Sequence, residues 1–200
     1  INLSLSDELE ARDLLKRKRF PFGYITDSVS DNIALGKVKW DRTDFRYAIA
    51  ARDSEDLPDK VWDNEFKLAF DSWSEITPLT FNQVGLQDEF DLIISVGSRG
   101  REGFGQEGDI LAWAQLPPTK RFDGILLSKF DLAEKWILPD SKELGTILRC
   151  VAAHEIGHLL GLPHSTDPKA LMYPFYNPST TKPKDDDIKN IQKLYGKPKG

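Results

Sequence analysis

All three histidines of the chain lie within residues 154–164, a window that reads HEIGHLLGLPH. On a helix, side chains four residues apart share a face, so His154 and His158 are expected to direct their imidazoles to one point. Gly161 can adopt the left-handed conformation that ends a helix and turns the chain back, which lets His164 reach that point from another direction. Three neutral imidazoles with an open fourth position are typical of a catalytic zinc site, whereas structural zinc sites are closed by four protein ligands.

An acidic side chain stands beside the first of these ligands. Glu155 follows His154 directly, so it is expected to lie near a bound metal ion without having to coordinate it. A zinc-bound water has its pKa lowered toward about 7, and a nearby carboxylate can take its proton as the water attacks a carbonyl that the metal polarises. The pattern therefore predicts amide hydrolysis with Glu155 as general base. The plainer alternative, histidines that only pack in a core or lie on a surface, is disfavoured because all five specified residues coincide in one window.

Composition excludes several other classes of protein. The 200 residues are 40% hydrophobic and 30% charged, which fits a globular domain and excludes collagen, coiled coils and disordered chains. The net charge of -5 offers no broad basic surface, so nucleic acid is not an expected partner. No apolar run approaches the roughly 20 residues of a membrane span, and the start at Ile1 suggests a processed or excised chain. The single cysteine, Cys150, excludes an internal disulfide and a multi-thiolate metal site.

Hydrophobic periodicity predicts the elements that must position the histidine window. Apolar alternation and short apolar runs predict five strands, at residues 45–51, 79–84, 92–96, 110–116 and 125–130. Aromatic residues at helical spacing predict a core-facing helix over residues 62–73. A second helix is predicted over residues 143–160, carrying the first two histidines, and a last one carries Ile188, Ile191, Leu194 and Tyr195.

The only methionine of the chain, Met172, follows the histidines in the segment ALMYPFY at residues 170–176. A long zinc motif followed by such a methionine resembles the metzincin clan of metallopeptidases, in which a methionine turn passes beneath the metal. The stretch VAAHEIGH at residues 151–158 and the closing stretch DDDIKNIQKLYG at residues 185–196 resemble one metzincin family, the matrixins or matrix metalloproteinases. The similarity covers about residues 37–196.

The matrixin resemblance implies an α+β fold for residues 37–200. This metzincin-like catalytic domain would have a twisted, mixed, mostly parallel five-stranded sheet, two long helices, a C-terminal helix, and zinc in an active-site cleft. The resemblance also implies a zinc metalloendopeptidase that is secreted or extracellular and acts on extended polypeptides. A monomer is the default expectation for the oligomeric state.

The resemblance also implies how a substrate would bind. An extended polypeptide would pair with the edge strand at residues 110–115 and insert the apolar side chain that follows the scissile bond into a pocket beside the zinc. The implied pocket residues are Leu111, Ala112, Pro174 and Tyr176, with Cys150 at the floor. Because cysteine is small, we expect a fairly deep pocket that accepts Leu, Met or aromatic side chains. An inert buried thiol at Cys150 is the open alternative.

The chain departs from the family at two further metal sites. Many matrixins hold a second, structural zinc with three histidines and an aspartate, and no histidine is left here for it, so no second zinc is expected. Trp113 and Lys129 stand where ligands would be, and an indole and a cation are expected to brace the loops instead. For calcium, Asp131 and Glu134 match one part of a family site, but Gly105 replaces an acidic partner, so a calcium ion and a solvated acidic loop are both retained.

Residues 1–36 differ in character from the rest and carry the basic run KRKR at their middle. One hypothesis is a short propeptide cut after Arg19. No cysteine precedes Cys150 to block the zinc, so Asp27 or Asp31 would be the latency ligand, because a carboxylate also binds zinc. The other hypothesis is a structural extension in which the basic run is only a solvated helix end.

Two alternatives to a matrixin-like peptidase are carried forward. The first is a non-catalytic or latent zinc-binding module used for protein interaction. An intact Glu155 argues against it, because loss of that residue is the simplest route to inactivity. The second is another metzincin branch, against which Ser165, directly after His164, favours the matrixins.

Overall fold

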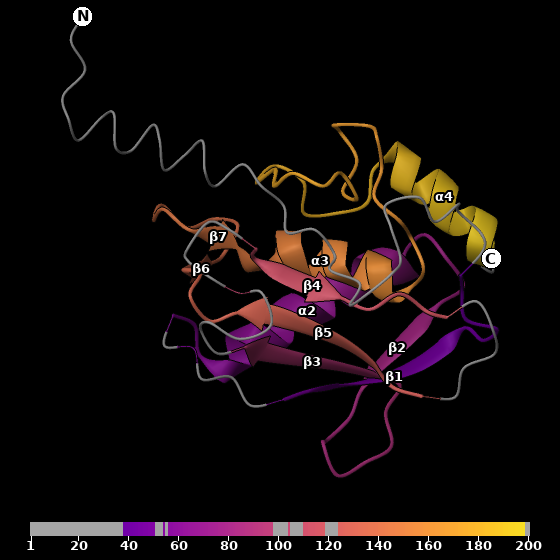
Figure 1. Ribbon diagram of the computed structural model, residues 1–200, viewed down its shortest axis with the longest axis horizontal. Helices are drawn as coiled ribbons and strands as arrows, with labels where there is room; N and C mark the ends of the chain where they lie inside the picture. Colours follow the sequence, from indigo (N-terminus) through magenta and orange to yellow (C-terminus); the bar gives the residue numbers. More distant parts are fainter. Residues whose placement is uncertain are drawn as a thin grey trace, which may run out of the picture.

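The computed structural model describes residues 38–50, 54, 56–97, 104, 110–118 and 124–198. Its main sheet has five strands in the order β2-β1-β3-β5-β4 (Figure 1). The strands are β1 (Asp44–Ile49), β2 (Thr80–Gln83), β3 (Leu92–Gly97), β4 (Ala112–Ala114) and β5 (Leu126–Asp131). Strands β1, β2, β3 and β5 pair in parallel, and β4 runs antiparallel to β5. The predicted mixed, mostly parallel five-stranded sheet is confirmed.

Strand β4 forms one edge of this sheet. It pairs with β5 through Ala112 opposite Phe130, Trp113 opposite Lys129, and Ala114 opposite Ser128. No strand in the described part of the chain lies against its other side. The edge strand that was expected within residues 110–116 is therefore present, although it is shorter.

Helices α2 (Asp59–Ser74) and α3 (Leu148–Leu159) contact each other and the sheet, so they cover the same face of it (Figure 1). The buried stripe of α2 includes Trp62, Phe66, Phe70 and Trp73, as the aromatic spacing predicts. These rings reach the strands: Phe70 stacks on Tyr47 with centroids 4.2 Å apart, and Phe66 meets Phe130 edge-on at 5.1 Å. The core therefore lies between the helix pair and the sheet. Helix α3 packs on this core through its contacts with α2, β4 and β5.

Helix α3 begins later than its sequence predicts. The expected start at residue 143 is wrong, because Thr146–Ile147 forms strand β7, which pairs in parallel with β6 (Trp136–Ile137). The N–H of Thr146 donates to the carbonyl of Lys135 at 2.8 Å, and a Cβ at Gly145 would collide with Ile137. Both β7 residues are β-branched and favour an extended backbone, so this pairing delays the helix.

The last helix is α4 (Asp185–Tyr195), as expected. Its first turn carries three aspartates, which complement the positive end of the helix dipole. Among the described residues, no helix has both the length and the apolarity to span a membrane. Residues 1–36 lie outside the described residues, so the predictions on Arg19, Asp27 and Asp31 are not placed, and the same holds for Gly105.

Candidate metal centre

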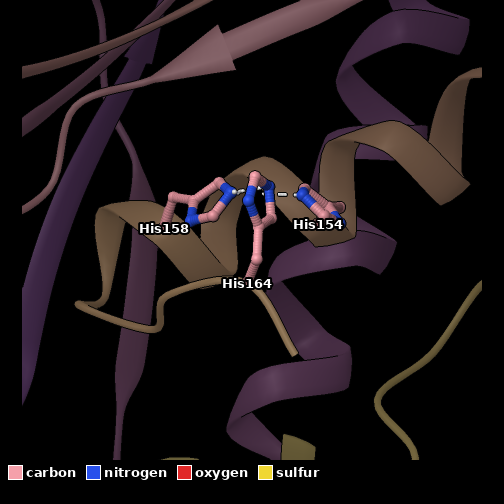
Figure 2. Close-up of side chains that lie close together, drawn as sticks. All are labelled: His154, His158 and His164. Atoms are coloured by element: carbon pink, nitrogen blue, oxygen red, sulfur yellow. Dashed lines mark hydrogen bonds between the residues drawn. The ribbon is translucent and has the colours of Figure 1, made fainter. Parts of the chain in front are cut away.

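The three histidines converge at the end of helix α3. His154 and His158 lie one turn apart on α3, and His164 comes from the segment that follows the helix (Figure 2). The Nε2 atom of His158 lies 3.1 Å from Nε2 of His154 and 3.2 Å from Nε2 of His164. Within the described ranges, this is the one group of three or more ligating side chains that could hold a metal ion.

Backbone carbonyls orient two of the rings. The Nδ1–H of His154 donates to the carbonyl of Leu171 at 2.7 Å, and the Nδ1–H of His158 donates to the carbonyl of Leu162 at 2.7 Å. A carbonyl only accepts, so each Nδ1 carries the hydrogen and each Nε2 presents its lone pair. Burial, with a smaller effect from the neighbouring imidazoles, lowers the pKa of His154 well below its usual value and that of His158 to about 3. Both rings are therefore in the neutral form that binds metals.

This donor set fits a zinc ion. Tetrahedral zinc with Zn–N bonds near 2.0–2.1 Å requires ligand nitrogens about 3.3 Å apart, close to the 3.1 and 3.2 Å that separate Nε2 of His158 from Nε2 of His154 and of His164. Converging lone pairs repel one another unless a cation lies between them. His164 is only partly buried, so the cluster has a side open to solvent. The arrangement could therefore bind one zinc ion and leave a coordination position for a water or a substrate.

The turn between the second and third histidines is a Schellman motif. The N–H of Gly161 donates to the carbonyl of His158 at 2.8 Å, and the N–H of Leu162 donates to the carbonyl of Gly157 at 2.9 Å. Gly161 has a φ of 97°, as its predicted role in ending the helix requires. A Cβ at this position would also collide with the carbonyl oxygen of Val38. The glycine thus permits both the turn and the close approach of a distant segment.

Glu155 is fully buried beside the first ligand. Neither carboxylate oxygen has a hydrogen-bond partner among the described residues, and burial raises its pKa well above the usual value. A buried carboxylate without a partner is costly in a purely structural role. Its unfilled capacity to accept hydrogen bonds therefore favours a ligand or a reacting group close by.

Met172 packs beneath α3 at a position left open by a glycine. A Cβ at Gly157 would collide with Sδ of Met172 and lie 3.1 Å from the Trp73 ring. The N–H groups of Leu171 and Met172 donate to the buried carboxylate of Asp187 at 2.7 and 3.0 Å. Sequence reasoning missed Gly157 and Asp187, although a glycine inside the zinc motif and an aspartate run opening α4 are the signals that could have found them.

The residues implied for the substrate pocket are mostly packed. Leu111, Ala112 and Cys150 are buried, and the hydroxyl of Tyr176 accepts the N–H of Ile147 at 2.8 Å. The Cys150 thiol lies 2.9 Å from the carbonyl of Thr180 and 3.2 Å from that of Asn177. Burial raises its pKa to about 12.

Of two pockets in the described part of the chain, one borders the candidate centre. One of about 260 Å³ adjoins His164 and Met172, and one of about 370 Å³ lies between Asp167 and Asp185. Neither of these two is lined by Pro174 or by the other predicted pocket residues. The assignment of the substrate pocket thus stays a prediction.

The residues considered for further metals are engaged with protein groups. Asp131 is buried and accepts the N–H of Ala133 at 2.8 Å, and Glu134 accepts the hydroxyl of Thr146 at 2.9 Å. Neither belongs to a cluster of three ligating groups within the described ranges, and calcium binding stays a prediction.

Comparison with known proteins identifies the family. The sequence profile named Matrixin matches residues 39–196. The chain is 38% identical to Stromelysin-1 of Equus caballus in an alignment of 170 positions that covers 82% of the chain and 34% of that protein. It is 38% identical to Matrix metalloproteinase-16 of Rattus norvegicus in an alignment of 182 positions that covers 82% of the chain and 28% of the relative. It is 37% identical to Stromelysin-3 of Mus musculus in an alignment of 201 positions that covers 97% of the chain and 36% of the relative.

The chain spans about a third of the length of these curated relatives. The matched region nevertheless contains the whole sheet, all the described helices and the histidine cluster. With the match over residues 39–196 and these identities, the chain belongs to the matrixin family.

Proposed function

We propose that this chain is the catalytic domain of a zinc-dependent endopeptidase that hydrolyses internal bonds of extended polypeptides. The observation that carries the proposal is the convergence of the three imidazoles. Nε2 of His158 lies 3.1 Å from Nε2 of His154 and 3.2 Å from Nε2 of His164, and the Nδ1 atoms of two rings are already bonded to carbonyls. Membership of the matrixin family supports it, as does the printed name of one relative, a metalloproteinase.

His154, His158 and His164 would hold the zinc ion. Zinc in such a site polarises a peptide carbonyl and lowers the pKa of a coordinated water toward about 7. Glu155 would act as general base, taking the proton of the attacking water and returning it to the leaving amine. Its burial and its lack of a partner among the described residues support this role, because its oxygens keep their capacity to accept a proton.

Strand β4 is the proposed docking edge for the substrate. An extended peptide would add to it by backbone pairing and place the residue after the scissile bond in an apolar pocket formed by Leu111, Ala112, Pro174 and Tyr176. Cys150 is either the floor of this pocket or an inert buried thiol, and its reactivity decides between the two. Extracellular proteins as substrates and a secreted location are proposed on the family resemblance alone.

Cleavage of a quenched fluorescent peptide with Leu after the scissile bond tests the proposal. The full chain and a chain starting at Phe20 are each assayed with and without a zinc chelator, and bound zinc is counted. We expect chelator-sensitive cleavage that returns with added zinc. Cleavage by the shortened chain alone would make the N-terminal segment a propeptide, and equal cleavage would make it a structural extension.

A variant separates chemistry from binding. Glu155→Gln should keep one zinc per chain and lose more than about a thousandfold in rate, since the base is removed and the ligands stay. Glu75→Gln, at an exposed surface carboxylate, is the matched control and should cleave normally. One bound zinc with no cleavage by either parent chain would instead favour a non-catalytic zinc-binding module.

A further inference from the structure

The end of helix α3 is held by residues from both ends of the described chain. The indole Nε1–H of Trp40 donates to the carbonyl of Leu159 at 2.8 Å. The hydroxyl of Tyr195 donates to the next carbonyl, that of Leu160, at 2.7 Å. The same hydroxyl accepts the backbone N–H of Trp40 at 3.1 Å. We call Trp40 and Tyr195 the clasp.

The clasp completes the hydrogen bonding of the helix end. The last carbonyls of an α-helix lack intrahelical partners. The Schellman motif satisfies the carbonyls of Gly157 and His158, and the clasp satisfies those of Leu159 and Leu160. Each of the four carbonyls from Gly157 to Leu160 therefore accepts a hydrogen bond where the chain turns toward His164.

The clasp residues are themselves held in place. The guanidinium of Arg42 lies 4.9 Å from the centroid of the Trp40 ring, and Phe45 meets that ring edge-on at 5.3 Å. Tyr195 is the last residue of α4, which lies on the α3 side of the sheet (Figure 1). The clasp therefore connects strand β1, through Phe45, and helix α4, through Tyr195, to the turn after α3.

The turn after α3 positions two of the three candidate ligands, His158 and His164. The carbonyl of Leu162 orients the ring of His158, and the same stretch of chain leads to His164, which lies beyond the helix. We propose that Trp40 and Tyr195 are positioning residues of the metal centre, which fix the turn and thereby the spacing between His158 and His164. The inference rests on the proposed zinc site and adds two residues that lie outside the histidine cluster.

Zinc affinity of the full chain tests the inference. The dissociation constant is measured by competition with a chromophoric chelator for the parent, Trp40→Phe and Tyr195→Phe. We expect each variant to raise it about tenfold, the range seen when the groups that orient metal ligands are removed. The visible absorption of the cobalt-substituted protein should change as well, because it reports the ligand geometry.

Matched controls separate positioning from general stability. Trp136→Phe removes an indole that donates to the carbonyl of Asp131 at 2.9 Å, and Tyr47→Phe removes a hydroxyl 3.4 Å from Gln83. Neither hydrogen bond involves the turn after α3, so both variants should keep the zinc dissociation constant within about twofold of the parent.

Clasp variants that bind zinc as tightly as the parent, with an unchanged cobalt spectrum, would overturn the inference and leave the proposed function standing. Equal weakening by controls and clasp variants would also overturn it. A parent chain that binds no zinc would instead contradict the proposed function. If one clasp variant fails to fold, the other provides the same test.

Discussion

Asp187 and His154 are joined through a single residue. The carboxylate of Asp187 accepts the N–H of Leu171 at 2.7 Å, and the carbonyl of Leu171 accepts the Nδ1–H of His154 at 2.7 Å. Because Asp187 lies in the first turn of α4, that helix sets the path of the backbone at Met172 and the orientation of a candidate ligand. Groups that orient a ligand in this way tune metal affinity.

Replacing Asp187 should therefore affect both stability and metal binding. Asp187→Ala leaves the buried N–H groups of Leu171 and Met172 and the partly buried N–H of Lys184 without this acceptor, so the free energy of unfolding should fall by about 2–4 kcal/mol. The zinc dissociation constant should rise about tenfold or more. Urea unfolding and chelator competition measure the two effects. Asp185→Ala, at an exposed position in the same turn, is the control, and equal losses in both variants would contradict the prediction.

A methyl group at Gly157 should destabilise the helix that carries the ligands. Gly157→Ala would gain about 1 kcal/mol of helix propensity, but its Cβ would collide with Sδ of Met172. Overpacking of this kind outweighs the gain, and we expect a net loss of about 1–2 kcal/mol in the free energy of unfolding. Combining it with Met172→Ala should cost less than the sum of the two single changes, since the methionine no longer clashes. Additive losses would show that the two residues do not compete for space.

The reactivity of Cys150 distinguishes a pocket-lining thiol from an inert one. Burial raises its pKa to about 12 from an ordinary 9.0, so the native thiol should resist an aromatic disulfide reagent at pH 8 and react only after unfolding. A raised pKa means that the folded state disfavours the thiolate. Stability should therefore be lost as the pH rises from about 9 toward 12. Rapid labelling of the native protein at pH 8 would show that solvent reaches the thiol.

An ion pair between helices α2 and α3 should contribute to stability. Nε and Nη2 of Arg149 donate to the two carboxylate oxygens of Glu65, at 2.9 and 2.7 Å. Glu65 itself is buried. Glu65→Ala leaves the arginine without this partner, and we expect a loss of about 2–3 kcal/mol in unfolding free energy, less than for a fully buried pair because Arg149 is partly exposed. The double variant Glu65→Ala with Arg149→Met should recover part of the loss. No recovery would mean that the pairing itself matters little.

Local spacing determined most of what the sequence reveals about the site. The window HEIGHLLGLPH places two imidazoles on one helix face and a glycine where the chain must turn, because residues four apart always meet on an α-helix. The helical spacing of aromatic residues predicted α2, and short apolar runs and alternation predicted the five strands. Both kinds of pattern arise because an element buries the side chains that face the core.

Contacts between distant segments decided the rest. Helix α3 starts at Leu148 because Thr146 pairs with Trp136 of strand β6, ten residues earlier, and this pairing leaves no mark in the apolar spacing of the helix. The acceptor for the His154 ring lies on Leu171, and the clasp joins residues 155 positions apart in the chain. A short sequence window determines which side chains can share a face. Which carbonyl, sulfur or indole they then meet depends on how sheet and helices pack, so only the tertiary structure decides it.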